Sequence, residues 1–267
     1  MAVKQLTNQV DKPKSYKKEI DALRMVAQHK HKHILPLLSS YSRPRKGVIE
    51  FCLIFPQARC NLLTLWEEHA SHPADNNIFS WMLTQCRGLA DALVQVHHES
   101  KDSVGNSLVG RQGNIHPYNV LVFVDGTEPR DHLGTLVLAD FKNAEFYPQT
   151  SSPSQHGMEE VDRCRPSRWW DIWSLGCLLL SFVSWFLGGS ELLKKLEAGF
   201  AQAYREARNS KESNPLGTKN GSEAVGHIIR KMAVEVRIRG NSGLPPQFAN
   251  RMVVCATTRW MFPVCLW

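Results

Sequence analysis

Residues 112–121 read Gln-Gly-Asn-Ile-His-Pro-Tyr-Asn-Val-Leu, and in this stretch a polar loop passes into a strand. The loop ends at Asn119, and the apolar run VLVFVDG (120–126) that follows is typical of a β-strand. A turn rich in Gly, Pro and Asp separates this run from a second strand-like stretch, LGTLVLADF (133–141), which carries Asp140 near its end. We therefore expect a strand pair with Asn119 before its first strand and Asp140 after its second.

The N-terminal segment predicts a strand followed by a helix, each with one charged residue of interest. MAVKQL (1–6) is strand-like and carries Lys4. SYKKEIDALRMVAQHK (15–30) has the apolar spacing of an amphipathic helix and carries Glu19. The residues expected to share the buried face of this helix are Ile20, Leu23 and Ala27.

Two further strand-like runs follow this helix, HILPLLSSY (33–41) and GVIEFCLIFP (47–56). Between them, SRPRK (42–46) has the proline and charge content of a hairpin loop. The alternating histidines of HKHKH (29–33) have no converging Cys or carboxylate, so they indicate a solvated linker rather than a metal site.

Beyond residue 60 the pattern becomes mainly helical. NLLTLWEEHA (61–70), FSWMLTQCRGLADALVQVHHES (79–100) and ELLKKLEAGFAQAYREAR (191–208) have helical spacing, and 224–239 is expected to be another helix after the linker 209–222. In the 79–100 helix, the positions expected on the buried face are Leu83, Cys86, Leu89, Ala90, Leu93 and Val94.

The uncharged run IWSLGCLLLSFVSWFLGGS (172–190) is close to the length of a membrane-spanning helix. It contains internal serines, a cysteine and Gly176, ends in Gly188-Gly189, and lacks a flanking aromatic belt or basic cluster. A fully buried helix of a soluble domain has the same composition, and we favour that interpretation.

The composition is that of a folded intracellular protein. The chain has 267 residues, of which 43% are hydrophobic and 21% charged, which excludes a disordered or collagen-like chain. Its seven cysteines are scattered, never form a CxxC pair, and follow an N-terminus without an apolar signal region, so we expect a cytoplasmic location. The net charge of +7 is interleaved with acidic residues, which indicates solvated surface rather than a nucleic-acid partner.

Taken together, the order of these elements resembles the protein kinase fold. Ala2-Val3-Lys4 is similar to the strand-three lysine motif, and Glu19 lies in the helix that follows. Residues 112–121 resemble the catalytic loop, Asp140-Phe141-Lys142 the metal-binding Asp-Phe-Gly, and 171–176 the start of the central buried helix. The residues at 55–62 and 171–180 are similar to the corresponding segments of kinase-like proteins of filamentous fungi.

The resemblance implies an α+β, bilobal fold. It implies a truncated N-lobe sheet over residues 1–57 and a mainly helical C-lobe over 58–240, followed by an irregular tail at 241–267. It also supports the buried-helix interpretation of 172–190, so that we expect no membrane association.

The resemblance also implies a nucleotide site with two cofactors, ATP and Mg²⁺, both bound weakly. Lys4 would face the phosphates with Glu19 holding it, and Ala2 and Leu121 would enclose the adenine. Asn119 and Asp140 would hold Mg²⁺, a hard cation that takes oxygen ligands. The alternative for each of these residues is an ordinary surface charge or a turn residue.

Five departures from the family pattern predict impaired catalysis. Asn114 stands in place of the catalytic aspartate, and its amide cannot accept the substrate proton. Lys142 replaces the glycine of Asp-Phe-Gly, and His116 and Gln112 replace the lysine and the leading histidine of the loop. The glycine-rich loop that would cover the phosphates has no counterpart in the chain.

These departures lead to three functional hypotheses. The first is a pseudokinase with weak or no ATP binding that acts as an interaction module for other proteins. The second is an active Ser/Thr protein kinase whose glycine-rich loop is missing from this chain. The third is a fragment that does not fold alone, because the missing strands would leave an exposed sheet edge.

Overall fold

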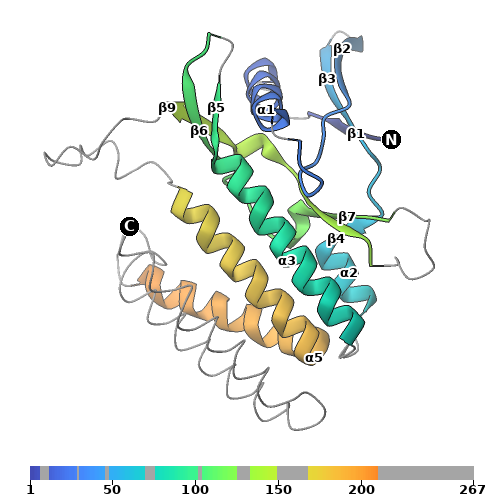
Figure 1. Cartoon of the computed structure of the whole chain (residues 1–267), viewed down its shortest axis with the longest axis vertical. Coiled ribbons are helices and arrows are strands. Elements are labelled where there is room, and N and C mark those ends of the chain that lie inside the picture. Colours follow the sequence, from blue (N-terminus) through green and yellow to red (C-terminus); the bar gives the residue numbers. More distant parts are fainter. Residues whose placement is uncertain are drawn as a thin grey trace, which may run out of the picture. The chain divides into compact units, whose positions relative to one another are not determined.

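The computed structural model describes residues 1–6, 12–28, 30–45, 48–69, 76–101, 104–124, 133–148 and 168–209, and all statements below concern these ranges. The fold is a mixture of helices and small sheets (Figure 1). The chain divides into two compact units, one of residues 1–65 and 83–175 and the other of 66–82 with the described part of the chain from 176 onward. The division into lobes at 1–57 and 58–240 stays a prediction, and the tail 241–267 lies outside the described residues.

The first unit begins with an antiparallel sheet in the order β1-β3-β2. β1 (Ala2–Gln5) pairs with β3 (Val48–Phe55), so that Lys4 lies opposite Leu53. Burial alternates along β1, and Val3 is more exposed than its two neighbours. This alternation places Ala2 and Lys4 on one face of the strand, and it confirms the predicted strand.

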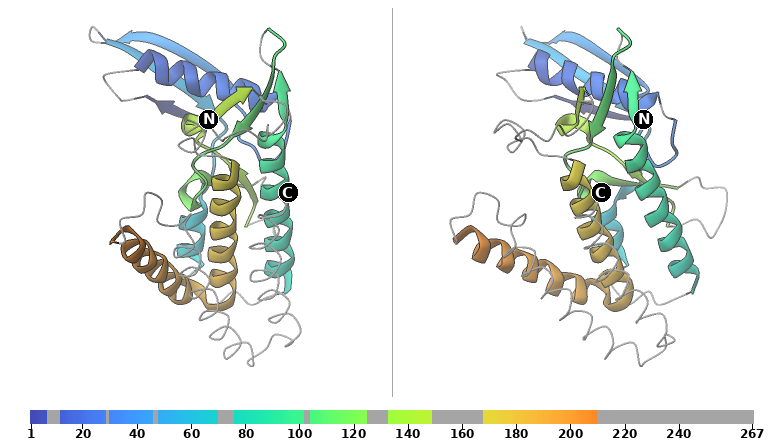
Figure 2. Two further views of the ribbon diagram at one scale, coloured as in Figure 1. Left: turned by 90° about the vertical axis from the view of Figure 1, so that its left-hand side faces the viewer. Right: turned by 60° about the vertical axis from the view of Figure 1, so that its left-hand side comes forward.

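Helix α1 (Lys12–Ala27) lies alongside this sheet (Figure 2). The rings of Tyr16 on α1 and Phe51 on β3 are 4.7 Å apart. The buried face of α1 carries Glu19, Ile20, Ala22, Leu23 and Val26. The helix is confirmed, but Ala27, its last residue, is exposed, and the buried face continues from Leu23 to Val26 instead.

The predicted hairpin is shifted along the sequence. β2 (Ser39–Arg45) pairs with β3 through the segment 42–45 that was expected to be a loop. Residues 33–35 leave the hairpin and hydrogen-bond instead to Leu138, which accepts from Leu35 N at 2.9 Å and donates to His33 O at 2.8 Å. The solvated-linker interpretation of HKHKH is therefore wrong for His33, whose residue exposure is 1%.

Two more three-stranded sheets complete the first unit. One has the order β4-β7-β8, with β4 (Cys60–Asn61), β7 (Val120–Phe123) and β8 (Thr135–Leu138), and it confirms the strand pair predicted after the loop 112–119. The other was not predicted. Its strands β5 (Glu99–Lys101), β6 (Ser107–Arg111) and β9 (Glu145–Pro148) read ESK, SLVGR and EFYP, and none of them shows a clear alternating apolar pattern.

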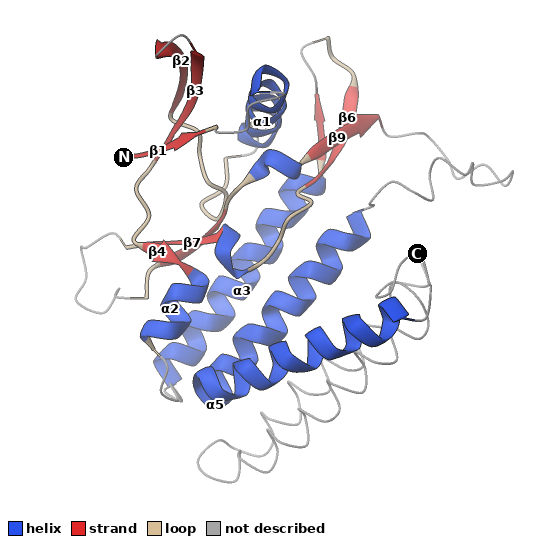
Figure 3. Cartoon of the chain, turned by 180° about the vertical axis from the view of Figure 1, so that it is seen from behind, coloured by secondary structure: helices blue, strands red, loops and turns tan. Residues whose placement is uncertain are grey.

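The described part of the second unit is helical (Figure 3). It includes the ends of α2 (Leu62–Glu68) and α3 (Asn76–His97) that lie within 66–82, and most of α5 (Arg168–Asn209). Its aromatic core contains Trp66, Phe182 and Trp185, and the Trp185 indole donates hydrogen bonds to the carbonyls of Trp66 and His69 at 3.2 and 3.0 Å.

Helix α3 confirms the predicted helix but not its whole buried face. Leu83 and Val94 are exposed, at 47% and 58%. The buried positions are Met82, Gln85, Gly88, Leu89, Ala92, Leu93 and Val96. The apolar residues of the sequence cover more of the helix surface than one core contact needs, so the pattern alone did not fix the buried stripe.

Helix α5 covers both the apolar run and the charged helix predicted after it, with a break at Gly188 and Gly189. Within the described ranges, Trp170–Gly199 is one segment long and apolar enough to cross a membrane. Part of this segment is buried within the protein, and core helices of soluble proteins meet the same criterion, so this is weak evidence for a span.

Candidate functional site

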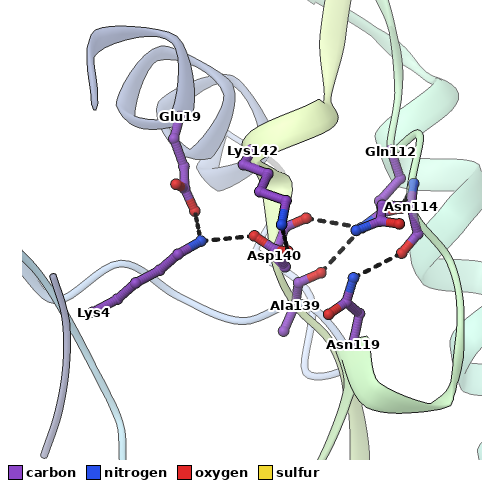
Figure 4. A network of polar contacts seen from close by, with 8 residues as sticks. All are labelled: Lys4, Glu19, Gln112, Asn114, Asn119, Ala139, Asp140 and Lys142. Atoms are coloured by element: carbon purple, nitrogen blue, oxygen red, sulfur yellow. Dashed lines mark hydrogen bonds and ion pairs between the residues drawn. The ribbon is translucent and has the colours of Figure 1, made fainter. Parts of the chain in front are cut away.

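Lys4 lies between two carboxylates that are distant in the sequence (Figure 4). Its ammonium nitrogen is 2.6 Å from Glu19 Oε1 and 2.7 Å from Asp140 Oδ1. The structure thus brings together three of the residues selected from the sequence, one from a strand, one from a helix and one from the end of another strand.

The local folding of each element explains this meeting. Lys4 shares the less exposed face of β1, and Glu19 lies on the buried face of α1 among aliphatic side chains. Asp140 follows β8 directly and is the residue before the short 3₁₀ helix η2 (Phe141–Asn143). Burial of Phe141 anchors η2, and so fixes the position of the Asp140 carboxylate.

Burial and the neighbouring charges together shift the pKa values of these three groups. Burial raises the pKa of Glu19 above its usual range, although Lys4 opposes this shift. Burial would also raise the pKa of Asp140, but the hydrogen bonds and charges of Lys4 and Lys142 outweigh it and lower that pKa. For Lys4, burial alone would lower the pKa, and the hydrogen bonds and charges of Asp140 and Glu19 raise it. Lys4 and Asp140 are therefore held charged at neutral pH.

Asp140 has an unusual backbone that the segment 112–121 supports. With φ of 57° and ψ of 74°, it is the one non-glycine residue with positive φ in the described part of the chain. The buried Gln112 side chain donates hydrogen bonds from Nε2 to the carbonyls of Ala139, at 3.0 Å, and Asp140, at 3.2 Å. These bonds hold a conformation that costs about 1–3 kcal/mol in isolation.

The loop around Gln112 is fixed by a second buried carboxylate, Asp171 in the first turn of α5. Asp171 accepts hydrogen bonds from the backbone N–H groups of Gln112 and Gly113, both at 2.7 Å, and contacts His97 Nε2 at 2.8 Å. The Gln112 side chain closes the loop by accepting from Asn114 N at 2.6 Å. The loop is therefore held from both sides by buried polar groups.

The remaining predicted residues lie in the same unit, but within the described part of the chain no hydrogen bond or ion pair joins them directly to Lys4, Glu19 or Asp140. Asn119, in the short η1 helix (Pro117–Asn119), donates its side-chain amide to Asn114 O at 3.0 Å, and its own carbonyl accepts from Ala139 N at 2.8 Å. Ala2 and Leu121 are half-buried on β1 and β7. Asn114 takes part in the site through its backbone groups.

Lys142 contributes a cation that the family pattern would not have. Its ammonium lies 3.2 Å from Asp140 Oδ2, on the second oxygen of the carboxylate that Lys4 binds through Oδ1. With both oxygens engaged by ammonium groups, this arrangement does not offer Asp140 to a magnesium ion. Among the described residues, no three or more His, Cys, Asp or Glu side chains form a group that could hold a metal.

Sequence reasoning missed a neighbouring ion-pair network on the third sheet. Glu145 on β9 pairs with Arg111 on β6 at 3.1 Å and with Lys18 on α1 at 3.3 Å. Burial would raise the pKa of Glu145, but Arg111 and Lys18 lower it. No motif signals this network, since its members become neighbours only when β6 and β9 pair. The sequence predicted Asp171 as the start of a helix but not as a hydrogen-bond acceptor for the loop. The signal that could have indicated its burial is its position directly before the apolar run 172–190.

Comparison with known proteins adds no assignment: a scan against protein-family models finds no matching family, and a search of curated proteins finds no match.

Proposed function

We propose that the chain is a cytoplasmic, protein kinase-like domain of the pseudokinase type, which binds ATP weakly or not at all and acts by interaction with other proteins. The observation that carries this proposal is the Lys4–Glu19–Asp140 cluster, next to a loop in which Asn114 stands where a catalytic base is needed. The cluster supports a nucleotide-type cleft, and the loop supports the loss of phosphotransfer.

The chemistry of the loop argues against catalysis. An amide such as that of Asn114 has no basicity at neutral pH, and a positioned base contributes about 10²–10⁴ in rate. His116 is the nearest titratable residue along the loop, and burial lowers its pKa, with Lys142 adding to this effect and Asp140 opposing it. Its ring packs edge-on against that of Tyr118, with 5.9 Å between the ring centroids. Within the described part of the chain, its ring nitrogens form no hydrogen bond with Asn114.

The chemistry of the cluster argues for weak affinity. A lysine that binds phosphates must present its ammonium to them, and Lys4 already satisfies Glu19 and Asp140 at 2.6 and 2.7 Å. Phosphate oxygens would have to compete with two carboxylates for the same ammonium group. We therefore expect a dissociation constant for ATP of millimolar order or weaker.

The test is thermal unfolding of the purified chain with ATP, beside a phosphotransfer assay. A ligand present at its dissociation constant adds about 0.4 kcal/mol, and one at 100 times that value about 2.7 kcal/mol. We expect ATP to stabilise the wild type by the smaller of these amounts, and we expect Lys4→Met to abolish this stabilisation. The control is Lys18→Met, which removes an exposed lysine that pairs with Glu145 and should keep the stabilisation by ATP. We expect no phosphotransfer to a protein substrate. Robust transfer by the unmodified chain would contradict the proposal.

A second candidate, an active Ser/Thr protein kinase, is favoured by one observation. The charged residues implied by the resemblance remain paired at hydrogen-bond distance, as an intact site requires. Phosphotransfer by the unmodified chain separates the two candidates, because the active kinase transfers phosphate with Asn114 in place and the pseudokinase does not. The Asn114→Asp variant then tests the role assigned to the loop: a carboxylate at position 114 should raise transfer by about 10²-fold or more if the rest of the site is competent.

A further inference from the structure

The Asp140 carboxylate is saturated by two lysines from within the chain. Lys4 Nζ is 2.7 Å from Oδ1, and Lys142 Nζ is 3.2 Å from Oδ2 (Figure 4). The two lysines reach the carboxylate from different elements, β1 and η2. Each oxygen of Asp140 therefore has its own cationic partner.

The charges around Asp140 are balanced without any added ion. The Lys4 and Lys142 ammonium groups offset the Glu19 and Asp140 carboxylates. Mg²⁺ requires near-octahedral oxygen ligands at about 2.0–2.1 Å. To reach Asp140 it would have to displace one ammonium group and approach the other, and like charges a few ångströms apart repel strongly in a partly buried site.

Of the two lysines that bind Asp140, Lys142 is the one whose role in excluding Mg²⁺ can be tested separately. It lies two positions after Asp140, at the end of a four-carbon stem, and its side chain is 55% exposed. Lys4, by contrast, is shared with the buried Glu19. Within the described residues, the ion pair of Lys142 is with Asp140, whereas Lys4 pairs with both Asp140 and Glu19. Removing the Lys142 ammonium therefore leaves the contacts of Lys4 with Glu19 and Asp140 in place.

We propose that the Lys142 ammonium occupies the position of a divalent cation at Asp140 and closes this carboxylate to Mg²⁺. Any nucleotide bound at the site, which is the part of this inference that rests on the proposed function, is then bound without a metal ion. Asp140 acts as a structural anion that orients two lysines, rather than as a metal ligand.

The first test uses Mn²⁺ alone, as a spectroscopic substitute for Mg²⁺, with the full chain and no nucleotide. Free Mn²⁺ is measured by electron paramagnetic resonance in titrations of the wild type and of Lys142→Met, which keeps the length of the side chain and removes its charge. Lys18→Met is the matched control, since Lys18 forms a carboxylate pair at 3.3 Å and its side chain is 48% exposed. A Lys142→Met/Asp140→Asn variant identifies the carboxylate responsible.

We expect Lys142→Met to bind Mn²⁺ about fivefold or more tightly than the wild type, which corresponds to an ion pair of about 1 kcal/mol. The gain should be absent in Lys18→Met and lost in the double variant. Equal Mn²⁺ affinity of the wild type and Lys142→Met would overturn the proposal, as would a gain that survives Asp140→Asn. Circular dichroism and cooperative unfolding show that each variant is folded.

The second test measures ATP affinity by thermal shift in EDTA and in Mg²⁺. We expect the wild type to give the same affinity within about twofold in the two buffers, and Lys142→Met to prefer Mg²⁺. A wild type that binds ATP only with Mg²⁺ would overturn the inference. If ATP binds to neither protein in either buffer, the chain is of the proposed type that does not bind nucleotide, and the Mn²⁺ comparison alone decides the role of Lys142.

Discussion

Lys4 binds two carboxylates that come from distant parts of the chain, and one of them, Glu19, is almost completely buried. Removing one partner of a buried ion pair is more costly than the net value of the pair, because the other charge is left without compensation. The Glu19 side chain is 2% exposed, whereas that of Lys4 is 33% exposed. The cost of losing the lysine should therefore be concentrated at Glu19.

We predict that Lys4→Met lowers the free energy of unfolding by about 2 kcal/mol, measured by urea denaturation at pH 7. Adding Glu19→Gln should restore part of this loss, because the neutral amide needs no cation. Lys18→Met, which removes an exposed pair, should cost about 0–1 kcal/mol. Equal losses in Lys4→Met and Lys18→Met would show that the buried cluster does not stabilise the fold.

Gln112 connects the loop to the strained backbone of Asp140 through a side chain with no exposed surface. In Gln112→Met, two carbonyls and the Asn114 N–H lose their partner, and each unsatisfied buried group costs about 1–3 kcal/mol. We predict a loss of about 2–4 kcal/mol in urea denaturation. Gln57→Met, at an exposed position, serves as the control and should change stability by less than about 0.5 kcal/mol. A Gln112→Met protein as stable as this control would refute the prediction.

At the scale of the element, α5 consists of two helical halves separated by a glycine pair. Gly189 has φ of 61° and ψ of −158°, a backbone region open almost only to glycine. Gly176 in the same helix is exposed and helical, and an added methyl group would meet nothing within 4 Å. One helix thus contains a glycine that the backbone requires and one that it does not.

We predict opposite effects for the same substitution at these two positions. Gly189→Ala should lower stability by about 1–3 kcal/mol, because alanine does not adopt that conformation. Gly176→Ala should raise it by about 0.5–1 kcal/mol, because alanine is the better helix former. Thermal unfolding measures both, and a destabilised Gly176→Ala or a neutral Gly189→Ala would contradict this account of the break.

For the whole molecule, the charged cluster makes stability depend on pH. The pKa of Asp140 is lower in the folded state, because Lys4 and Lys142 outweigh the effect of burial. A lowered carboxyl pKa contributes stability that is present above the ordinary value of about 3.9 and is lost as the pH falls through the folded value. The raised pKa of Glu19 acts in the opposite sense, so that its contribution is present at acid pH and is lost as the pH rises through the folded value.

The difference in unfolding free energy between the wild type and Asp140→Asn isolates the contribution of Asp140. We predict that the difference in unfolding free energy is constant from about pH 5 to 8 and shrinks as the pH falls below about 3.9. Denaturant titrations at a series of pH values provide the measurement, with Asp21→Asn on the exposed side of α1 as the charge-matched control. A difference that grows below pH 3.9 would reverse the sign of the argument.

The sequence predicted most of the elements around the candidate site because their signals are local. A hydrophobic pattern is visible in the strand with Lys4, in the helix with Glu19 and in the strand pair that follows the loop 112–119. It failed where the signal is not local. The strands of the β5-β6-β9 sheet show no alternating apolar pattern, and the pairing of residues 33–35 with Leu138 joins segments about one hundred residues apart.

The sequence by itself determined which chemical groups are available, namely a lysine, a glutamate and an aspartate on separate elements, an asparagine at position 114, and a second lysine after the aspartate. The tertiary structure decided how they combine: Lys4 binds both carboxylates, Gln112 holds the Asp140 backbone, and Lys142 takes the second Asp140 oxygen. The reason is physical. Residue type and hydrophobic period are properties of single segments, whereas an ion pair depends on the distance between segments, which only their packing fixes.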